Sequence, residues 1–221
     1  MKTRCLKLTL LGLLLVSMIS PVVAGAASSE VDKKVVVHNQ CLTPSMVQLN
    51  NNLRKLWTDH VVWTRNYIVS AVAGMEDQEK VLARLLQNQQ DLGNAIKPFY
   101  GEAAGNKLAG LLREHILIAG KIVAAAKTGN QADVAKFSKD FYKNADEIVQ
   151  FLSSANPNWS KKELKELLYT HLQLVTEAAV TRIGKDWDAD IRTFDKAENH
   201  ILKMADVLSA GIIKQFPAQF K

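Results

Sequence analysis

The stretch that decides the fold is residues 53–61, LRKLWTDHV, in which two leucines three residues apart precede a histidine by seven and four residues. Side chains at this spacing lie on one face of an α-helix. The same pattern occurs twice more, in residues 108–116 (LAGLLREHI) and 164–172 (LKELLYTHL). Self-similarity of this kind predicts a fold made of repeated helical units.

Each copy of the pattern is followed by a glycine, 13 or 14 residues after its histidine. These glycines are Gly74, Gly129 and Gly184. Glycine commonly follows a helix C-terminus because it adopts the left-handed conformation without steric cost. We therefore expect each copy to be the first helix of a hairpin that turns at its glycine.

Other signals place the remaining helix boundaries. Thr43, followed by proline, opens the first helix, and Pro98 is expected to end the second. Residues 155–158 (ANPN) break the chain after the fourth helix, and residues 160–163 (SKKE) are a capping box that opens the fifth. No segment alternates with the period of a strand. The sequence predicts an all-α, up-and-down six-helix bundle of three repeated helical hairpins over residues 43–217.

The first 27 residues have the layout of a secretory signal peptide, with a basic start, an apolar run over residues 8–19 and small residues at cleavage spacing. The apolar run is shorter than the roughly 20 residues that span a bilayer. An uncleaved membrane anchor is the alternative. We expect a signal peptide at 1–27, a flexible lead-in at 28–42, and a secreted or cell-envelope protein without a stable membrane span after cleavage.

Charge and cysteine content exclude other classes. Residues 1–27 hold three basic and no acidic residues, so the rest of the chain has 25 basic and 22 acidic residues and a net charge of +3. That balance does not suggest a nucleic-acid partner. Cys41 is the one cysteine after the signal, so no internal disulfide is expected. Its thiol either pairs between chains or has no role.

Polar side chains are predicted to share the interior with the leucines. The three histidines lie on apolar helix faces, and two asparagines of the second helices lie in line with apolar residues. In an antiparallel hairpin, residues at equal distances from the turn stand at the same height. The predicted mid-bundle layer contains His60, His115, His171, Asn88 and Asn144, with Asp91, Glu147 and His200 one turn further along.

Two hypotheses account for such a layer, because buried polar groups are costly unless they are paired. The first is a site for a divalent transition metal, Zn²⁺, Fe²⁺ or Mn²⁺, held by His60, His115, His171 and His200 with Asp91 and Glu147. In the second, histidine and asparagine pairs only fix helix packing in a non-catalytic structural or interaction protein. No nucleophile elbow or phosphate-binding loop is present, so an enzyme is not expected.

Three segments carry a resemblance to a known group of proteins: residues 56–65 (LWTDHVVWTR), 85–88 (LLQN) and 96–101 (IKPFYG). With these, the chain resembles a family of small exported proteins of Gram-positive, spore-forming bacteria over about residues 50–217. That family has no established biochemical role. Some relatives carry enzyme names, such as acetylglutamate kinase or glycosyltransferase, that no motif in these helices supports. The resemblance implies export and lineage, and no mechanism.

Overall fold

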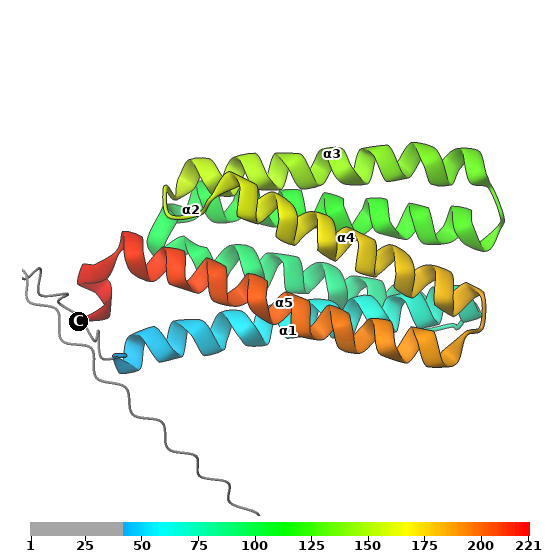
Figure 1. Ribbon diagram of the computed structural model, residues 1–221, viewed down its shortest axis with the longest axis horizontal. Helices are drawn as coiled ribbons and strands as arrows, with labels where there is room; N and C mark the ends of the chain where they lie inside the picture. Colours follow the sequence, from blue (N-terminus) through cyan, green and yellow to red (C-terminus); the bar gives the residue numbers. More distant parts are fainter. Residues whose placement is uncertain (1–41) are drawn as a thin grey trace, which may run out of the picture. The chain divides into compact units, whose positions relative to one another are not determined.

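The computed structural model describes residues 42–221 (Figure 1). This part of the chain is helical and contains no strand, so the predicted all-α class is confirmed. The signal peptide expected at 1–27, and all but the last residue of the lead-in expected at 28–42, lie outside the described residues. The helices are α1 (Pro44–Ala73), α2 (Gln78–Lys127), α3 (Gln131–Ala155), α4 (Lys161–Ile183) and α5 (Trp187–Gln215), followed by the 3₁₀ turn η1 (Pro217–Phe220).

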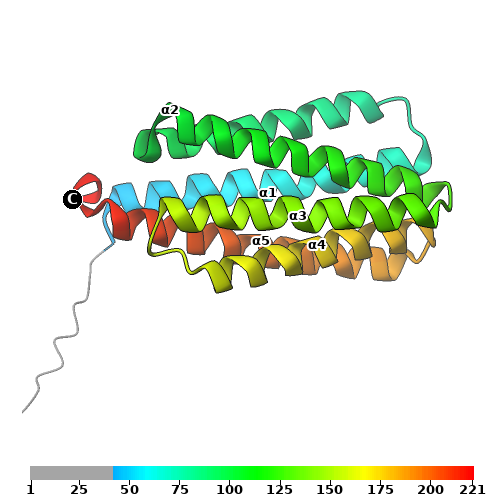
Figure 2. The same ribbon diagram turned by 90° about the horizontal axis from the view of Figure 1, so that it is seen from above.

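The prediction of six helices is wrong in its count, because the described residues form five α-helices. The expected second and third helices are joined in α2, which doubles back at Gly101 (φ 82°, ψ 170°). Its two halves lie side by side in both views (Figures 1 and 2). Pro98 does not end a helix but lies inside α2. A proline lacks a backbone donor and kinks a helix, whereas a full reversal of the chain needs a positive φ that glycine alone adopts freely.

The two halves of α2 pack with their backbones in contact. A Cβ atom on Gly93 would stand 2.5 Å from the carbonyl oxygen of Gly105 and 2.8 Å from Cβ of Ala109. Only small residues at the crossing allow this approach, and the close contact fixes the register of the hairpin. In the sequence, the small residues Gly93 and Ala109 lie eight residues to either side of Gly101, and Gly105 lies four residues after it.

The other helix boundaries follow the expected local chemistry. Thr43 caps α1, because its Oγ1 accepts from the amide of Met46 at 3.3 Å and also contacts the carbonyl of Phe220 at 2.8 Å. Ser160 caps α4 by accepting from the amide of Glu163 at 3.4 Å. Gly74 ends α1 in the left-handed conformation, with φ of 69°.

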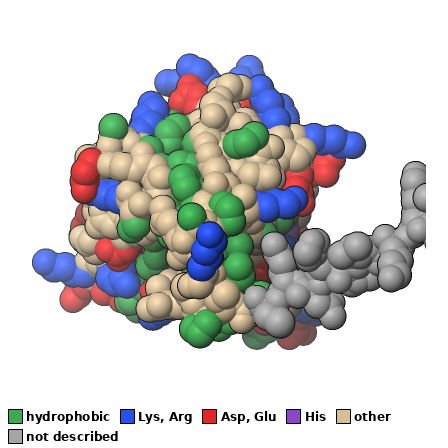
Figure 3. Space-filling model, turned by 90° about the vertical axis from the view of Figure 1, so that its left-hand side faces the viewer, with side chains coloured by type: hydrophobic (Ala, Val, Ile, Leu, Met, Phe, Trp, Pro, Cys, Tyr) green, Lys and Arg blue, Asp and Glu red, His purple; other side chains and the backbone are tan. Residues whose placement is uncertain are grey.

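The helices form a closed arrangement around one interior. The helix α1 packs against α2 and α5, α3 lies between α2 and α4, and α1 also contacts α4 across the interior. In Figure 1, α3 lies along one side of the bundle, and α1 and α5 run together along the other. Seen from one end, charged side chains gather toward the edge of the face, with hydrophobic side chains between them (Figure 3). Within residues 42–221, no helix combines the length and apolarity that crossing a membrane requires.

Candidate functional site

Three buried imidazoles from three helices meet in the middle of the bundle. His60 on α1, His115 on the second half of α2 and His171 on α4 are each at most 3% exposed. The ring centroids of His60 and His171 are 5.4 Å apart, and those of His115 and His171 are 5.9 Å apart. The prediction that these histidines face inward at a common height is confirmed.

One hydrogen-bond arrangement occurs three times around these imidazoles. Each acceptor is the backbone carbonyl four residues before a core histidine, and each donor is a side chain of the next helical segment along the chain. The three bonds are Asn88 Nδ2 to the carbonyl of Leu56 at 2.9 Å, Asn144 Nδ2 to that of Leu111 at 3.1 Å, and His200 Nε2 to that of Leu167 at 2.8 Å. Each bond ties the two helices of a hairpin together at the height of the layer.

The histidine of the second hairpin is held in one tautomer. Asn144 donates its amide nitrogen to the carbonyl of Leu111, so its Oδ1 is left as the acceptor. His115 Nδ1 lies 2.9 Å from this oxygen and therefore carries the proton. The ring also stacks on Phe141 with centroids 4.4 Å apart. His115 is thus a neutral group with a defined orientation.

The other two core histidines differ, because Nδ1 of His60 and Nδ1 of His171 are buried without a hydrogen-bond partner. Gln89, which the sequence analysis did not single out, is fully buried beside Asn88 and donates to its Oδ1 at 3.1 Å. Its own Oε1 lacks a partner. Gln89 gave no signal in the sequence, because the matching positions of the other hairpins, Ala145 and Ile201, are apolar.

The environment of the layer keeps its imidazoles uncharged. Burial, followed by the effect of His115, lowers the pKa of His60 from 6.5 to about 3, although nearby Gln89 and Asn88 oppose the shift. Burial lowers the pKa of His115 to about 4, against the opposing hydrogen bond of Asn144. Burial, together with the other histidines, holds the pKa of His171 well below 6.5. Desolvation dominates all three shifts.

The remaining residues of the predicted layer lie elsewhere. Asp91 accepts a hydrogen bond from Gln87 at the surface, and Glu147 is exposed beside Lys143. Neither carboxylate is brought together with the core histidines. His200 is half-buried and makes the same type of hydrogen bond as Asn88 and Asn144. Counting residues from the glycines had instead placed it level with Asp91 and Glu147. Helix α5 is therefore shifted along its axis by about one turn from the position expected by counting residues from Gly184.

A buried ion cluster adjoins the layer toward the α4–α5 turn. Asp190 is 1% exposed and receives both terminal nitrogens of Arg65, with Nη2 at 2.6 Å, and Nη1 of Arg182 at 3.2 Å. Burial raises the pKa of Asp190, but the two guanidinium groups outweigh this and lower it. Neither Arg65 nor Asp190 belongs to the polar layer that the sequence predicts. The pairing arises from a contact between residues 125 positions apart, which no local pattern reveals.

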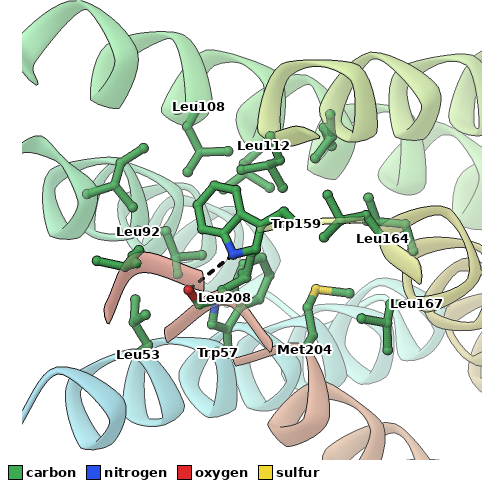
Figure 4. Close-up of a pocket in the computed structure, with 15 residues that line it drawn as sticks. Leu53, Trp57, Leu92, Leu108, Leu112, Trp159, Leu164, Leu167, Met204 and Leu208 are labelled. Atoms are coloured by element: carbon green, nitrogen blue, oxygen red, sulfur yellow. Dashed lines mark hydrogen bonds between the residues drawn. The ribbon is translucent and has the colours of Figure 1, made fainter. Parts of the chain in front are cut away.

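Two small cavities flank the layer, each with a volume of about 20 Å³. Figure 4 shows the first, an apolar cavity around Trp159, whose indole donates to the carbonyl of Leu208 at 3.3 Å. The second lies between α1, α4 and α5, and Thr64, Arg65 and His171 line it. A volume of this size has room for about one water molecule, so neither cavity accommodates an organic substrate.

No family model matches this chain, and no curated protein or solved structure does either. Over residues 42–221, no three His, Cys, Asp or Glu side chains are grouped so that they could hold a metal ion. The fold and the site define an all-helical bundle with a buried layer of histidine, asparagine and glutamine.

Proposed function

We propose that this chain is a non-catalytic structural or interaction protein, whose histidine and asparagine layer fixes the packing of its helices. The observation that carries this is the recurrence of one bond, from Asn88, Asn144 and His200 to the carbonyl four residues before a core histidine. A buried donor without its acceptor is costly, so each bond disfavours helix registers that would break it.

The threefold recurrence also supports an origin from three related hairpins. The donor and the acceptor carbonyl are 32 residues apart in the first hairpin and 33 in the other two. Different side chains, asparagine twice and histidine once, make the same contact. Although the side chains differ, all three positions donate a hydrogen bond to the neighbouring helix.

A double variant tests the structural role. Replacing both His115 and Asn144 with leucine removes a satisfied polar pair and leaves apolar side chains in its place. We expect this variant to fold with a free energy of unfolding within about 1 kcal/mol of the natural protein. Asn144→Leu alone leaves His115 Nδ1 unpaired, so it should cost about 1–3 kcal/mol.

Urea unfolding followed by circular dichroism measures both variants. A double variant that is less stable than Asn144→Leu, or that fails to fold, would show that the imidazole does more than satisfy its partner. Leu152→Ala is a control for a simple loss of core packing, because Leu152 is buried in the same bundle without polar contacts.

A metal-binding layer is the second candidate, favoured by the unpaired Nδ1 atoms of His60 and His171 on rings 5.4 Å apart. Neutral imidazole is the form that ligates Zn²⁺, Fe²⁺ or Mn²⁺. His115 lies next to this pair, so a third ligand is available after a change of side-chain conformation. Asp91 and Glu147 would remain outside such a site.

Elemental analysis of untagged protein separates the two candidates. The structural role predicts less than about 0.1 equivalent of any transition metal per chain, and no change in Tm when Zn²⁺, Fe²⁺ or Mn²⁺ is added. Metal binding predicts about one equivalent, a higher Tm with metal, and the loss of both in His171→Leu. His200→Gln is the control, because it preserves a side-chain donor near the carbonyl of Leu167 and changes a half-buried residue.

We propose further that the protein is exported to the cell envelope or the medium, as the layout of residues 1–27 and the family resemblance suggest. Expression with and without residues 2–27 tests this. We expect the full chain to appear outside the cytoplasm, shortened by about 27 residues, and the truncated chain to stay inside the cell. N-terminal sequencing of the exported form would identify the cleavage site.

A further inference from the structure

The three hairpins form a ring, and each pair of neighbouring hairpins meets along a seam between two helices. The first hairpin is α1 with the first half of α2, the second is the other half of α2 with α3, and the third is α4 with α5. The seams are formed by the two halves of α2, by α3 with α4, and by α5 with α1. Each hairpin therefore contacts both of the others.

Two of the three seams are also bridged by the chain itself. The halves of α2 are joined through Gly101, and α3 is joined to α4 through residues 156–160. Both connections lie at the same end of the bundle as η1 (Figure 1). The third seam brings together the first and the last α-helix of the described chain, so no loop links α5 to α1. Segments tethered by a short loop lose less entropy on meeting than segments far apart in the chain.

At this end of the bundle, η1 occupies the place of a third connecting loop. The carbonyl of Phe220 accepts a hydrogen bond from Oγ1 of Thr43, the N-cap of α1, at 2.8 Å. Phe220 is 4% exposed, and its ring stacks on Phe99 with centroids 5.7 Å apart and planes 18° apart. Phe99 lies two residues before Gly101, at the end of the first half of α2. The residues after α5 therefore hold both helices of the first hairpin.

Polar side chains add to this closure along the α1–α5 seam. Asp190 on α5 pairs with Arg65 of α1 in the buried ion cluster. Nearer to η1, Asp206 pairs with Arg54 at 2.7 Å and accepts a hydrogen bond from Asn50 at 2.9 Å. These contacts compensate for the absence of a loop between the two helices.

We propose that η1 is a clasp, which replaces a third connecting loop, and that the ring opens at the α1–α5 seam when the clasp is released. The opened form keeps the other two seams, because Gly101 and residues 156–160 still tether them. Such a local opening requires less free energy than global unfolding and exposes only the surfaces that separate. The clasp goes beyond the structural role proposed for the layer, because it contains none of the layer's residues.

A thiol placed in the seam reports its opening. Ser209 on α5 is 2% exposed, and its hydroxyl accepts a hydrogen bond from Asn50 of α1 at 2.8 Å. The reporter is the full chain with Ser209→Cys, in which Cys5 and Cys41 are replaced by serine. Its rate of labelling with iodoacetamide, followed by mass spectrometry without denaturant, measures how often the seam separates.

Phe220→Ala in this reporter weakens the clasp. We expect labelling at position 209 to become at least about tenfold faster, which corresponds to about 1.4 kcal/mol, because a buried phenylalanine contributes more than this. Val149→Ala is the control. Val149 is buried on α3, which packs against α2 and α4 and keeps these neighbours in the opened form. The control should lower the urea midpoint but change labelling less than about twofold.

Two results would overturn the inference. Labelling that is unchanged in Phe220→Ala would show that the clasp does not hold the seam. Equal acceleration in Phe220→Ala and Val149→Ala would show that position 209 becomes accessible only when the whole domain unfolds.

A second pair of variants tests the clasp without removing an aromatic ring. Thr43→Ala removes the hydroxyl that bonds to Phe220, together with the cap of α1, whereas Ser160→Ala removes only the cap of α4. We expect labelling at position 209 to accelerate about threefold in Thr43→Ala and to stay unchanged in Ser160→Ala. If the two variants label at the same rate, the bond to Phe220 has no part in closing the seam and the inference fails.

Discussion

Acidification should destabilise this fold at a pH where most proteins are stable. The pKa of His60 is lowered to about 3 and that of His115 to about 4, and the pKa of His171 lies well below 6.5. In the unfolded chain, each histidine titrates near 6.5. Because the folded values are depressed, the stabilisation is fully present above pH 6.5 and is lost as the pH falls toward the folded values.

For His60 and His115 the size of the effect at pH 5 depends almost entirely on the unfolded chain, since their folded pKa values of about 3 and about 4 lie below 5. Protonation of one histidine in the unfolded state at pH 5 then costs about 2 kcal/mol of folding free energy. These two groups together cost about 4 kcal/mol, and His171, whose pKa is lowered in the same direction, adds to that cost. The whole stability of a typical domain is only about 5–15 kcal/mol. With an m-value of about 2 kcal/mol/M, the urea midpoint should fall by at least about 2 M.

Urea unfolding between pH 5 and 8, followed by circular dichroism, measures this slope. Below pH 6 we expect at least two protons to be taken up on unfolding, which corresponds to about 3 kcal/mol per pH unit. The double variant His115→Leu, Asn144→Leu should lose one of these protons. Thr176→Val is the control, because the hydroxyl of this partly buried threonine donates to the carbonyl of Leu172 within α4, and it should keep the full proton uptake. A midpoint that changes by less than about 0.5 M between pH 7.5 and 5 would refute the reasoning. Asp146, Asp190 and Asp206, whose pKa values are lowered from 3.8, respond only at lower pH.

Paired substitutions test the packing and the ion cluster. Gly93→Ala should cost about 2–3 kcal/mol, because its Cβ meets the opposite half of α2, whereas Gly110→Ala, which faces open space in the same helix, should stabilise by about 0.4–1 kcal/mol. If urea unfolding gave the same change in stability for both glycine variants, the close contact between the two halves of α2 at Gly93 would be contradicted. Asp190→Asn should cost about 3 kcal/mol by leaving Arg65 and a second guanidinium without a carboxylate. Asp206→Asn is the control, because Asp206 pairs with Arg54 at the surface, and it should cost at most about 1 kcal/mol. Similar losses of stability in the two variants would show that burial does not make the Asp190 cluster more important than a surface ion pair.

The sequence predicted what depends on local periodicity. Histidines at helical spacing from leucines have to share the buried face, and the structure confirms this for His60, His115 and His171. Capping residues such as Thr43 and Ser160 also placed helix starts correctly, because a cap acts within one turn.

What the sequence could not predict depends on contacts between distant segments. The reversal at Gly101 was assigned to Pro98, since a proline is the stronger local signal while a positive φ becomes visible only in three dimensions. The exact register between α4 and α5 placed His200 one turn away from the expected position. Glu147 lies near an apolar stripe, and its outward direction is decided by the way α3 packs between α2 and α4.

Nitrogen NMR of the histidine side chains tests most directly whether the layer consists of neutral, metal-free packing groups. At pH 7 we predict that His60, His115 and His171 are all neutral, that His115 is the Nδ1–H tautomer because it donates to Asn144, and that added Zn²⁺ leaves their resonances in place. An imidazolium signal from any of the three, or a shift of their nitrogens with one equivalent of metal, would contradict a purely structural layer.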